Sequence, residues 1–308
     1  MTTYMFRDTL EWIRFFKKNL DIPVMIGGYN LRVYPRESMA HPEIDFGVVE
    51  QAYYTLPALL DELGKKEPDF TRVPGLAYKK NEKVFVTPHP QEIDFNLFPN
   101  PARHLLPNEL YAEFPTERRN FTVMVTSLGC PRNCSFCEAG KTPYKPRSPE
   151  TVIREIEECY ERYGIREIDI FDYDFTAIPS RTREICRLIC SRGLDVTWAC
   201  RSRIDNVDFS LLREMKEAGC RRIYFGIESG VEAILKNINK NIDIARIKST
   251  LSACKKLGIR TLGFFLVGAP GDTKKTFKET VKFAKSLDLD YVQFSKTLAK
   301  PLTPLWKD

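Results

Sequence analysis

Short runs of β-branched and aromatic residues alternate with amphipathic stretches from residue 121 onward. Six runs have strand character (121–128, 167–172, 195–200, 221–227, 260–268 and 290–295), and five stretches between them have helical spacing (148–164, 181–193, 209–219, 244–258 and 273–287). Parallel strands need crossovers of this kind, so the pattern predicts a parallel α/β sheet, either doubly wound or closed as a barrel. Six units rather than the eight of a full barrel favour a partial (β/α)6 barrel of the TIM type.

The first 120 residues show a shorter and less regular pattern. A helix is predicted with Leu10, Ile13, Phe16 and Leu20 on one face, followed by two buried strands (22–28 and 44–49), a second helix (55–64) and a hairpin (75–87). These strands are too few to form a comfortable sheet of their own. We therefore expect a small α/β domain at 1–85, a polar, proline-containing linker at 86–120, and the barrel at 121–308.

Composition and charge are those of an ordinary folded protein. Hydrophobic residues make up 43% of the 308 residues and charged residues 29%, and 47 Lys and Arg against 41 Asp and Glu leave a net charge of +6. The two signs are mixed along the chain, which indicates neither a nucleic-acid partner nor a membrane surface. No signal peptide and no apolar run of membrane-spanning length is visible, so we expect a cytoplasmic protein with reduced thiols.

Three of the nine cysteines, Cys130, Cys134 and Cys137, follow the first predicted barrel strand with the spacing C-x3-C-x2-C. A structural zinc site would need four ligands, and the nearest histidine, His104, is 26 residues upstream of the first cysteine. Three buried thiols are a further alternative, although residues 131–133 do not have a core pattern. Three thiolates suit a four-iron cluster, because one iron then stays open to a non-protein ligand.

The remaining six cysteines lie in predicted helices or strands among apolar neighbours. We expect them to be buried and assign them no chemistry: Cys159, Cys186, Cys190, Cys200, Cys220 and Cys254.

The cysteine motif after the first strand of a partial barrel resembles that of the radical S-adenosylmethionine (SAM) enzymes, and the similarity extends from about residue 121 to about residue 305. In that family, SAM chelates the open iron of a [4Fe-4S] cluster, and an electron from the cluster breaks a carbon–sulfur bond to give a 5'-deoxyadenosyl radical. The resemblance implies that Cys130, Cys134 and Cys137 are the cluster ligands and that Phe136 lies against the adenine.

Further segments resemble the family in the same order. "RSPE" with "FDYDFT", "WACRSRID", "FGIESG", "LKNINKNI" and "GFFLVGAPGDT" imply cofactor contacts from Asp172, Arg203, Glu228, Lys240 and Gly268. Tyr173 stands where the family often has an acidic residue. Taken alone, Arg203 and Lys240 would be interpreted as surface residues and Gly268 as part of a turn. The assignment of cofactor contacts therefore depends on the order in which all these motifs follow the cysteines. No residue is assigned as a catalytic acid or base.

Residues 22–64 resemble part of the Rossmann-like cobalamin (B12)-binding domain that precedes the barrel in a subgroup of these enzymes. That subgroup contains the anaerobic magnesium-protoporphyrin ester cyclase and several C-methyltransferases. The D-x-H-x-x-G motif and the first strands are missing, so we expect an incomplete domain that does not bind cobalamin by itself. The chain resembles a fragment truncated at both ends.

The resemblance implies a radical SAM enzyme for C-methylation or another radical modification of a small-molecule, lipid or tetrapyrrole-type substrate. An electron donor such as flavodoxin or ferredoxin is implied, and a separate chain with the missing half-domain is a second expected partner. The alternative is a catalytically inert or partner-dependent truncated iron–sulfur protein.

Overall fold

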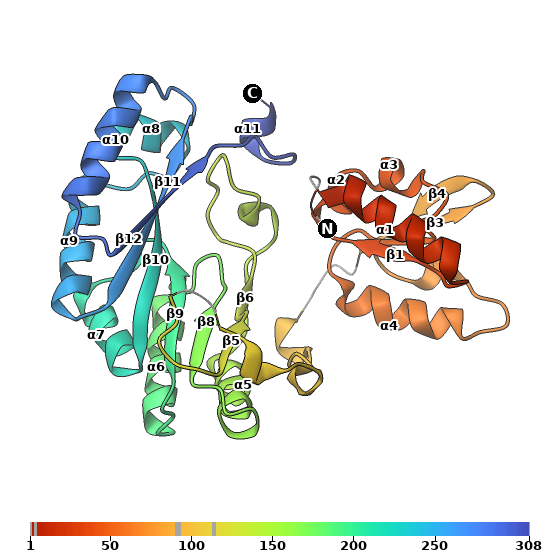
Figure 1. Ribbon diagram of the computed structural model, residues 1–308, viewed down its shortest axis with the longest axis horizontal. Coiled ribbons are helices and arrows are strands. Elements are labelled where there is room, and N and C mark those ends of the chain that lie inside the picture. The colour runs from red at the N-terminus through yellow and green to blue at the C-terminus, as the bar shows by residue number, and fades with distance from the viewer. Residues whose placement is uncertain (1, 3–4, 90–93, 113–114, 308) are drawn as a thin grey trace. The chain divides into compact units, whose positions relative to one another are not determined.

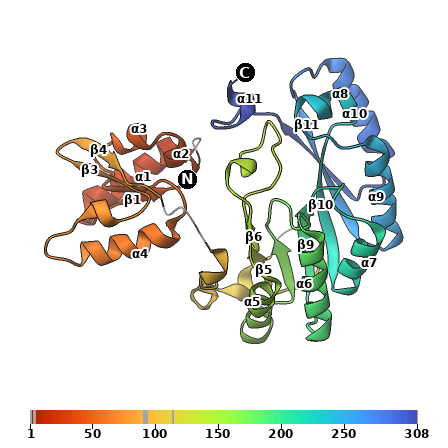
Figure 2. The same ribbon diagram turned by 180° about the vertical axis from the view of Figure 1, so that it is seen from behind.

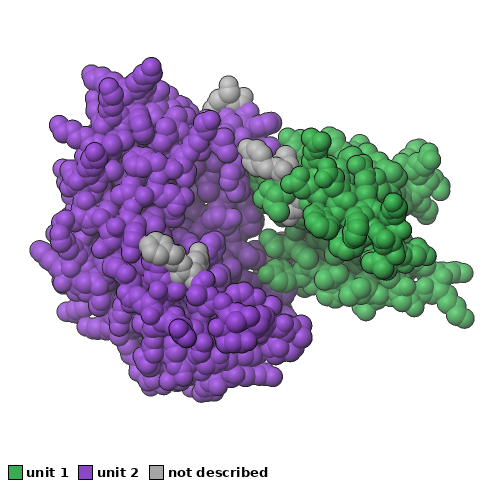
Figure 3. Space-filling model, viewed as in Figure 1, with its two compact units in different colours: residues 1–93 green, residues 94–308 purple. Residues whose placement is uncertain are grey.

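The structure is a computed structural model that describes residues 2, 5–89, 94–112 and 115–307. The chain forms two compact units, residues 1–93 and residues 94–308 (Figure 3). Each unit has its own sheet and its own buried core. Among the described residues, no helix is both long enough and apolar enough to cross a membrane.

The first unit is a small α/β domain with helices on both faces of a four-stranded sheet. Its elements are α1 (Phe6–Asn19), β1 (Met25–Gly27), α2 (Tyr29–Val33), α3 (Pro35–Met39), β2 (Phe46–Val48), α4 (Ala52–Leu63), β3 (Leu76–Lys80) and β4 (Lys83–Val86). The strand order is β1-β2-β3-β4, with only the first pair parallel. One core joins α1, α2 and α3 to the sheet, and a second core around Leu59 joins α4 to it.

Only part of the predicted face of α1 is buried. Leu10 and Ile13 lie in the core, whereas Phe16 and Leu20 are 44% and 47% exposed. Phe6 also packs against this core, so the covered part of the face lies in the first turns of the helix.

The second unit contains six parallel strands that follow one another in chain order. They are β5 (Phe121–Met124), β8 (Glu167–Ile170), β9 (Thr197–Ser202), β10 (Cys220–Glu228), β11 (Arg260–Val267) and β12 (Tyr291–Lys296). Every neighbouring pair is parallel. A doubly wound sheet reverses its strand order at one point. The uninterrupted order therefore confirms the partial (β/α)6 barrel.

Helices cover the outer face of this sheet (Figures 1 and 2). They are α5 (Pro149–Arg162), α6 (Pro179–Ser191), α7 (Phe209–Glu217), α9 (Ile244–Lys256) and α10 (Lys274–Ser286), whereas the short helix α8 (Glu232–Asn237) lies at the carboxyl end of the strands (Figure 1). Side chains of Ser148, Asp208, Asp243 and Thr273 cap the first turns of four of them. The five predicted helices agree with the structure to within a few residues, whereas periodicity missed two short helices of this unit, α8 and α11 (Pro304–Lys307).

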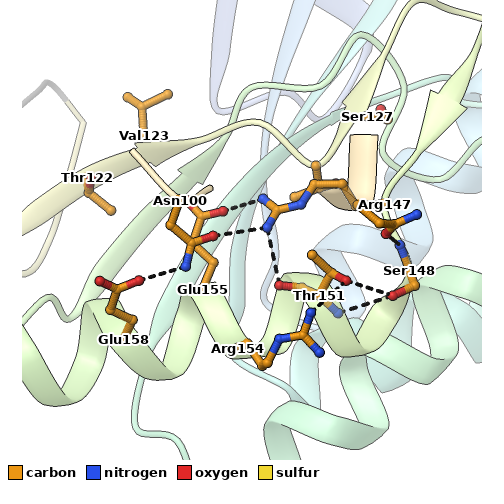
Figure 4. Close-up of polar contacts among 12 residues, drawn as sticks. Asn100, Thr122, Val123, Ser127, Arg147, Ser148, Thr151, Arg154, Glu155 and Glu158 are labelled. Atoms are coloured by element: carbon orange, nitrogen blue, oxygen red, sulfur yellow. Dashed lines mark hydrogen bonds and ion pairs between the residues drawn. The ribbon is translucent and has the colours of Figure 1, made fainter. Parts of the chain in front are cut away.

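Residues 94–120, which the sequence assigned to a linker, belong to the second unit from residue 94 on. Arg103 is 2% exposed, and its Nη2 lies 2.7 Å from Glu155 Oε1 and 3.1 Å from the carbonyl oxygen of Val123. Glu155 belongs to α5 and also pairs with Arg147, which in turn donates to Asn100 Oδ1 at 3.2 Å (Figure 4). This buried charge network fixes the stretch onto the first strand and first helix of the barrel.

Candidate functional site

The cysteine loop, residues 129–144, lies directly beyond the first barrel strand. It connects β6 (Ser127–Leu128) to β7 (Lys145–Pro146), and these two strands form an antiparallel pair. Gly129 has φ +65°, and a Cβ at this position would lie 2.2 Å from the carbonyl oxygen of Thr142. A Cβ on Gly140 would lie 2.1 Å from the carbonyl oxygen of Arg132. The two glycines therefore allow the loop to fold back closely on itself.

The three loop cysteines are at least partly shielded from water. Cys134 is 9% exposed, and Cys130 and Cys137 are half-buried. Burial raises the pKa of the Cys130 thiol and raises the pKa of Cys137 to about 11. Iron binds the thiolate form, so metal binding to these two side chains must release their protons.

The structure separates these three from the other six cysteines, with one correction. Cys159, Cys186, Cys200, Cys220 and Cys254 are buried as expected, whereas Cys190 is exposed. Cys190 lies in the last turn of α6, in which Ile189 takes the buried position and Cys190 lies on the exposed side.

The donor set can be compared with the two kinds of metal site. Within the described residues, no three His, Cys, Asp or Glu side chains converge closely enough to hold one metal ion. A structural zinc site needs four ligands on a single ion. In a four-iron cluster each thiolate binds a different iron, so the ligands need not meet at one point. The charges of Cys130 and Cys134 both act on the Cys137 thiol, so the three thiols are neighbours on one loop, and three neighbouring thiols are the donor set of a four-iron cluster with one open iron.

Asp172 anchors the start of the segment that leads into the cysteine loop. The residue is 1% exposed, and its carboxylate accepts from the backbone N–H groups of Thr126 (2.6 Å) and Ser127 (3.0 Å). It also accepts from both hydroxyls, at 2.6 and 2.7 Å. Burial raises the pKa of Asp172, against the lowering effect of these bonds. Its oxygens are bonded to the chain itself, so Asp172 acts on the loop rather than facing an open space.

Arg203 lies beside the middle cysteine. Its Nη1 is 3.9 Å from Cys134 Sγ, and its Nη2 donates to the carbonyl oxygen of Lys240 at 2.8 Å. Its Nε and Nη2 both donate to Asp205, each at 2.9 Å. Burial acts to lower the pKa of Arg203, but the bonds and charge of Asp205 outweigh it and raise the pKa. Asp174 joins this region by accepting from the Arg203 backbone N–H at 3.3 Å.

Glu228 and Lys240 form a buried ion pair at the end of β10. The two residues are each 6% exposed, and Nζ lies 3.1 Å from Oε1. Glu228 has φ +69°, a conformation that costs about 1–3 kcal/mol in a residue with a side chain. A Cβ at Gly226 would lie 2.5 Å from Glu228 Oε1 and 2.8 Å from Lys240 Nζ. The ion pair between Glu228 and Lys240 therefore occupies the space that a side chain at position 226 of β10 would need.

Phe136 packs in a small apolar cluster with the two segments that follow β10 and β11. The cluster contains Ile234 and Ile238 near α8, and Leu266 and Ala269 around the end of β11. Gly268 has φ +76°, and a Cβ at this position would meet nothing within 4 Å, so its surroundings are open. The hydroxyl of Ser135, next to Phe136, is buried without a hydrogen-bond partner. An apolar ring face, an open glycine and an unpartnered hydroxyl are compatible with a nucleoside ligand.

Two contacts hold the cysteine loop against the region of α8. The Ser135 N–H donates to the carbonyl oxygen of Ile238 at 3.0 Å, and Asn239 Nδ2 donates to the carbonyl oxygen of Asn133 at 2.7 Å. Residues 233–240 thus bring together Phe136, the cysteines and Lys240. Periodicity missed α8 because it has only six residues.

A further element, the C-terminal strap (residues 297–306), reaches the cysteine loop from the last strand. Lys300 Nζ lies 2.8 Å from Glu138 Oε2, and the Leu305 N–H donates to the carbonyl oxygen of Ser135 at 3.0 Å. Figures 1 and 2 show α11 (Pro304–Lys307) beside this loop. The strap therefore connects the carboxyl ends of β5 and β12, the two edge strands of the open sheet.

Solved structures of low sequence identity share the fold. TsrM from Kitasatospora setae, a radical SAM methyltransferase solved with cobalamin and a [4Fe-4S] cluster, has a TM-score of 0.79 at 20% identity over 98% of this chain and 62% of its own. The cobalamin-dependent SAM radical enzyme OxsB has a TM-score of 0.70 at 18% identity, over 98% of this chain and 44% of its own.

Sequence comparison gives relatives of higher identity. An uncharacterized methyltransferase from Pyrococcus horikoshii is 36% identical over 94% of this chain and 63% of its own length. The anaerobic magnesium-protoporphyrin IX monomethyl ester cyclase of Rubrivivax gelatinosus is 28% identical over 94% of this chain and 54% of its own. The chain thus spans between half and two thirds of these relatives. The sequence profile of the radical SAM superfamily matches residues 124–284, more than half of the chain, and the protein is a member of that superfamily.

Proposed function

We propose that this protein is a radical SAM enzyme that uses a [4Fe-4S] cluster to cleave S-adenosylmethionine reductively, for C-methylation or another radical modification of a substrate. The supporting observation is a loop with three cysteines at the carboxyl end of the first barrel strand, inside the stretch that matches the superfamily. When bound, such a cluster supplies the electron that breaks a carbon–sulfur bond of SAM.

Cys130, Cys134 and Cys137 are the proposed cluster ligands, and further residues are proposed to act on the cofactors. Phe136 offers a partly buried apolar face for the adenine ring, in a cluster with Ala269, and the neighbouring Gly268 is proposed to contact the cofactor as well. Glu228 and Lys240 supply opposite charges, which suit the hydroxyls and the carboxylate of SAM. Asp172 holds the loop in place through Thr126 and Ser127. Arg203 lies against a cluster ligand.

Burial of these groups also affects the chemistry. Glu228, Lys240 and Cys134 are all less than a tenth exposed, so water has little access to these side chains. Electrostatic contacts are stronger where water is excluded. The strap adds to this shielding through its contacts with Glu138 and Ser135.

The proposal extends to the rest of the system. Residues 1–85 are proposed to be part of a cobalamin-binding-like domain, and residues 121–308 the catalytic barrel. The sequence contains no D-x-H-x-x-G motif. A separate chain that carries the other half of such a domain is a proposed partner. The proposed electron donor is a flavodoxin or ferredoxin, the substrate a small molecule, a lipid or a tetrapyrrole, and the compartment the cytoplasm.

The experiment is anaerobic reconstitution with iron and sulfide, followed by dithionite reduction with SAM and an assay for 5'-deoxyadenosine. About four irons per chain with formation of 5'-deoxyadenosine are expected. Cys134→Ala should prevent cluster assembly, and Cys190→Ala, at an exposed cysteine outside the loop, is the matched control. A cluster without cleavage of SAM would favour the inert or partner-dependent alternative, and zinc in place of iron would refute the proposal.

A further inference from the structure

Arg203 is held in one orientation by three hydrogen bonds, none of which involves its Nη1. Asp205 accepts from Nε and Nη2 at 2.9 Å each, and the carbonyl oxygen of Lys240 accepts from Nη2 at 2.8 Å. The residue is 8% exposed. A guanidinium group is planar, so fixing one side of it also fixes the direction of the remaining nitrogen.

The remaining nitrogen, Nη1, points at a proposed cluster ligand. Its distance to Cys134 Sγ is 3.9 Å, within the range of an N–H···S hydrogen bond. Cys134 is the least exposed of the three loop cysteines, at 9%. Arg203 is thus a buried positive charge beside one sulfur, and Asp205 is a negative charge bound to the far side of the same guanidinium.

We propose that Arg203 and Asp205 together set the reduction potential of the cluster, acting through the Cys134 sulfur as positioning residues. This inference rests on the proposed function. Reduction adds one electron from an external donor to the cluster, which makes it more negative, and no bond in the protein changes. A positive charge and an N–H donor at a ligand sulfur favour the reduced state and so raise the potential. Asp205 offsets part of that charge.

The two residues should therefore shift the potential in opposite directions. Arg203→Gln removes the positive charge and lowers the potential, whereas Asp205→Asn leaves the arginine charge uncompensated and raises it. We expect a change of about tenfold in the reduction equilibrium for each, equal to about 59 mV for one electron. Arg203→Lys keeps the charge without the planar fork, so it should show less than half of the shift seen with Arg203→Gln.

The test is a redox titration of the reconstituted full chain without SAM, with the reduced cluster measured by electron paramagnetic resonance. Leaving SAM out separates this role from any contact between Arg203 and SAM. Arg183→Gln is the matched control, because Arg183 pairs with Asp208 and Glu214 on the outer helices and carries the same charge. Its potential should equal that of the wild type.

Opposite shifts for Arg203→Gln and Asp205→Asn would support the proposal. Unchanged potentials in a chain that assembles its cluster and cleaves SAM would overturn this inference alone. If Arg203→Gln assembles no cluster, Asp205→Asn and Arg203→Lys still decide the question, and a downward shift with Asp205→Asn overturns it. A wild-type chain without a four-iron cluster would overturn the proposed function and this inference with it.

Discussion

Removal of the Glu155 carboxylate should destabilise the barrel strongly. This side chain is 1% exposed and lies between two buried arginines, Arg103 at 2.7 Å and Arg147. Glu155→Ala leaves both guanidinium groups buried without their counter-ion. Loss of one partner from a buried ion pair costs about 3–5 kcal/mol in the free energy of unfolding. Glu155→Gln keeps the shape and one acceptor oxygen, so it should cost less, about 1–3 kcal/mol.

The assay is urea unfolding of the metal-free chain, followed by tryptophan fluorescence. The sequence has three tryptophans, and Trp198 is 2% exposed in the barrel core, whereas Trp12 and Trp306 are more than half exposed. In a background with both exposed tryptophans replaced by Phe, the signal reports on the barrel alone. The urea midpoint is expected to be lowest for Glu155→Ala, intermediate for Glu155→Gln and highest for the wild type.

Glu157→Gln is the matched control on the same helix. Glu157 pairs with Arg192 at 3.2 Å, and the two side chains are 24% and 57% exposed. Such surface pairs contribute about 0–1 kcal/mol. If Glu155→Ala cost no more than Glu157→Gln, the network would not fix residues 94–120 to the barrel as described.

Three further outcomes are expected. Cys134→Ala should lose the cluster while keeping the stability of the metal-free chain in urea within about 1 kcal/mol, because the residue lies in a loop; a large loss of stability would contradict this. Iodoacetamide at pH 8 should modify exposed Cys190 well before Cys254, whose pKa burial raises to about 12, and labelling of Cys254 should increase as the pH rises toward that value. Equal rates by mass spectrometry would refute the burial. Gly226→Ala should cost about 1–3 kcal/mol in urea unfolding, because its Cβ would lie 2.5 Å from Glu228 Oε1, and an unchanged midpoint would show that the ion pair can move aside.

Much of the barrel could be predicted from the sequence. The spacing of hydrophobic residues identifies the strands and helices, and a helix between each two strands indicates a parallel sheet. The six barrel strands and five of the helices from residue 121 on differ from the prediction by only a few residues, but the predicted first strand at 121–128 is divided into β5 and β6, and β7, α8 and α11 were missed. Each missed element has six residues or fewer, too few for a periodic pattern. Phe16 is exposed although it shares a predicted helical face with buried Leu10 and Ile13, because helical spacing shows which residues share a face but not how much of that face is covered.

The residues of the candidate site were selected from the order of motifs in the sequence, and their roles stay a prediction. Parallel topology explains why they lie together at the carboxyl end of the sheet, but it does not give their contacts. The bond from Arg203 to Cys134 joins residues 69 positions apart and depends on side-chain orientation, which no local pattern encodes. The same holds for Asp172, whose contacts with Thr126 and Ser127 direct it to the chain rather than to an open space.

The strap has a consequence for the order of events during synthesis. Glu138 and Lys300 are separated by 162 residues, so the cysteine loop leaves the ribosome long before the segment that covers it. At about 5–20 residues per second, this interval is roughly 8–30 s. During that time the three thiols are present while the Lys300 and Leu305 contacts cannot yet form. Cluster insertion therefore has an interval in which the loop is present without the strap, and the strap contacts form later.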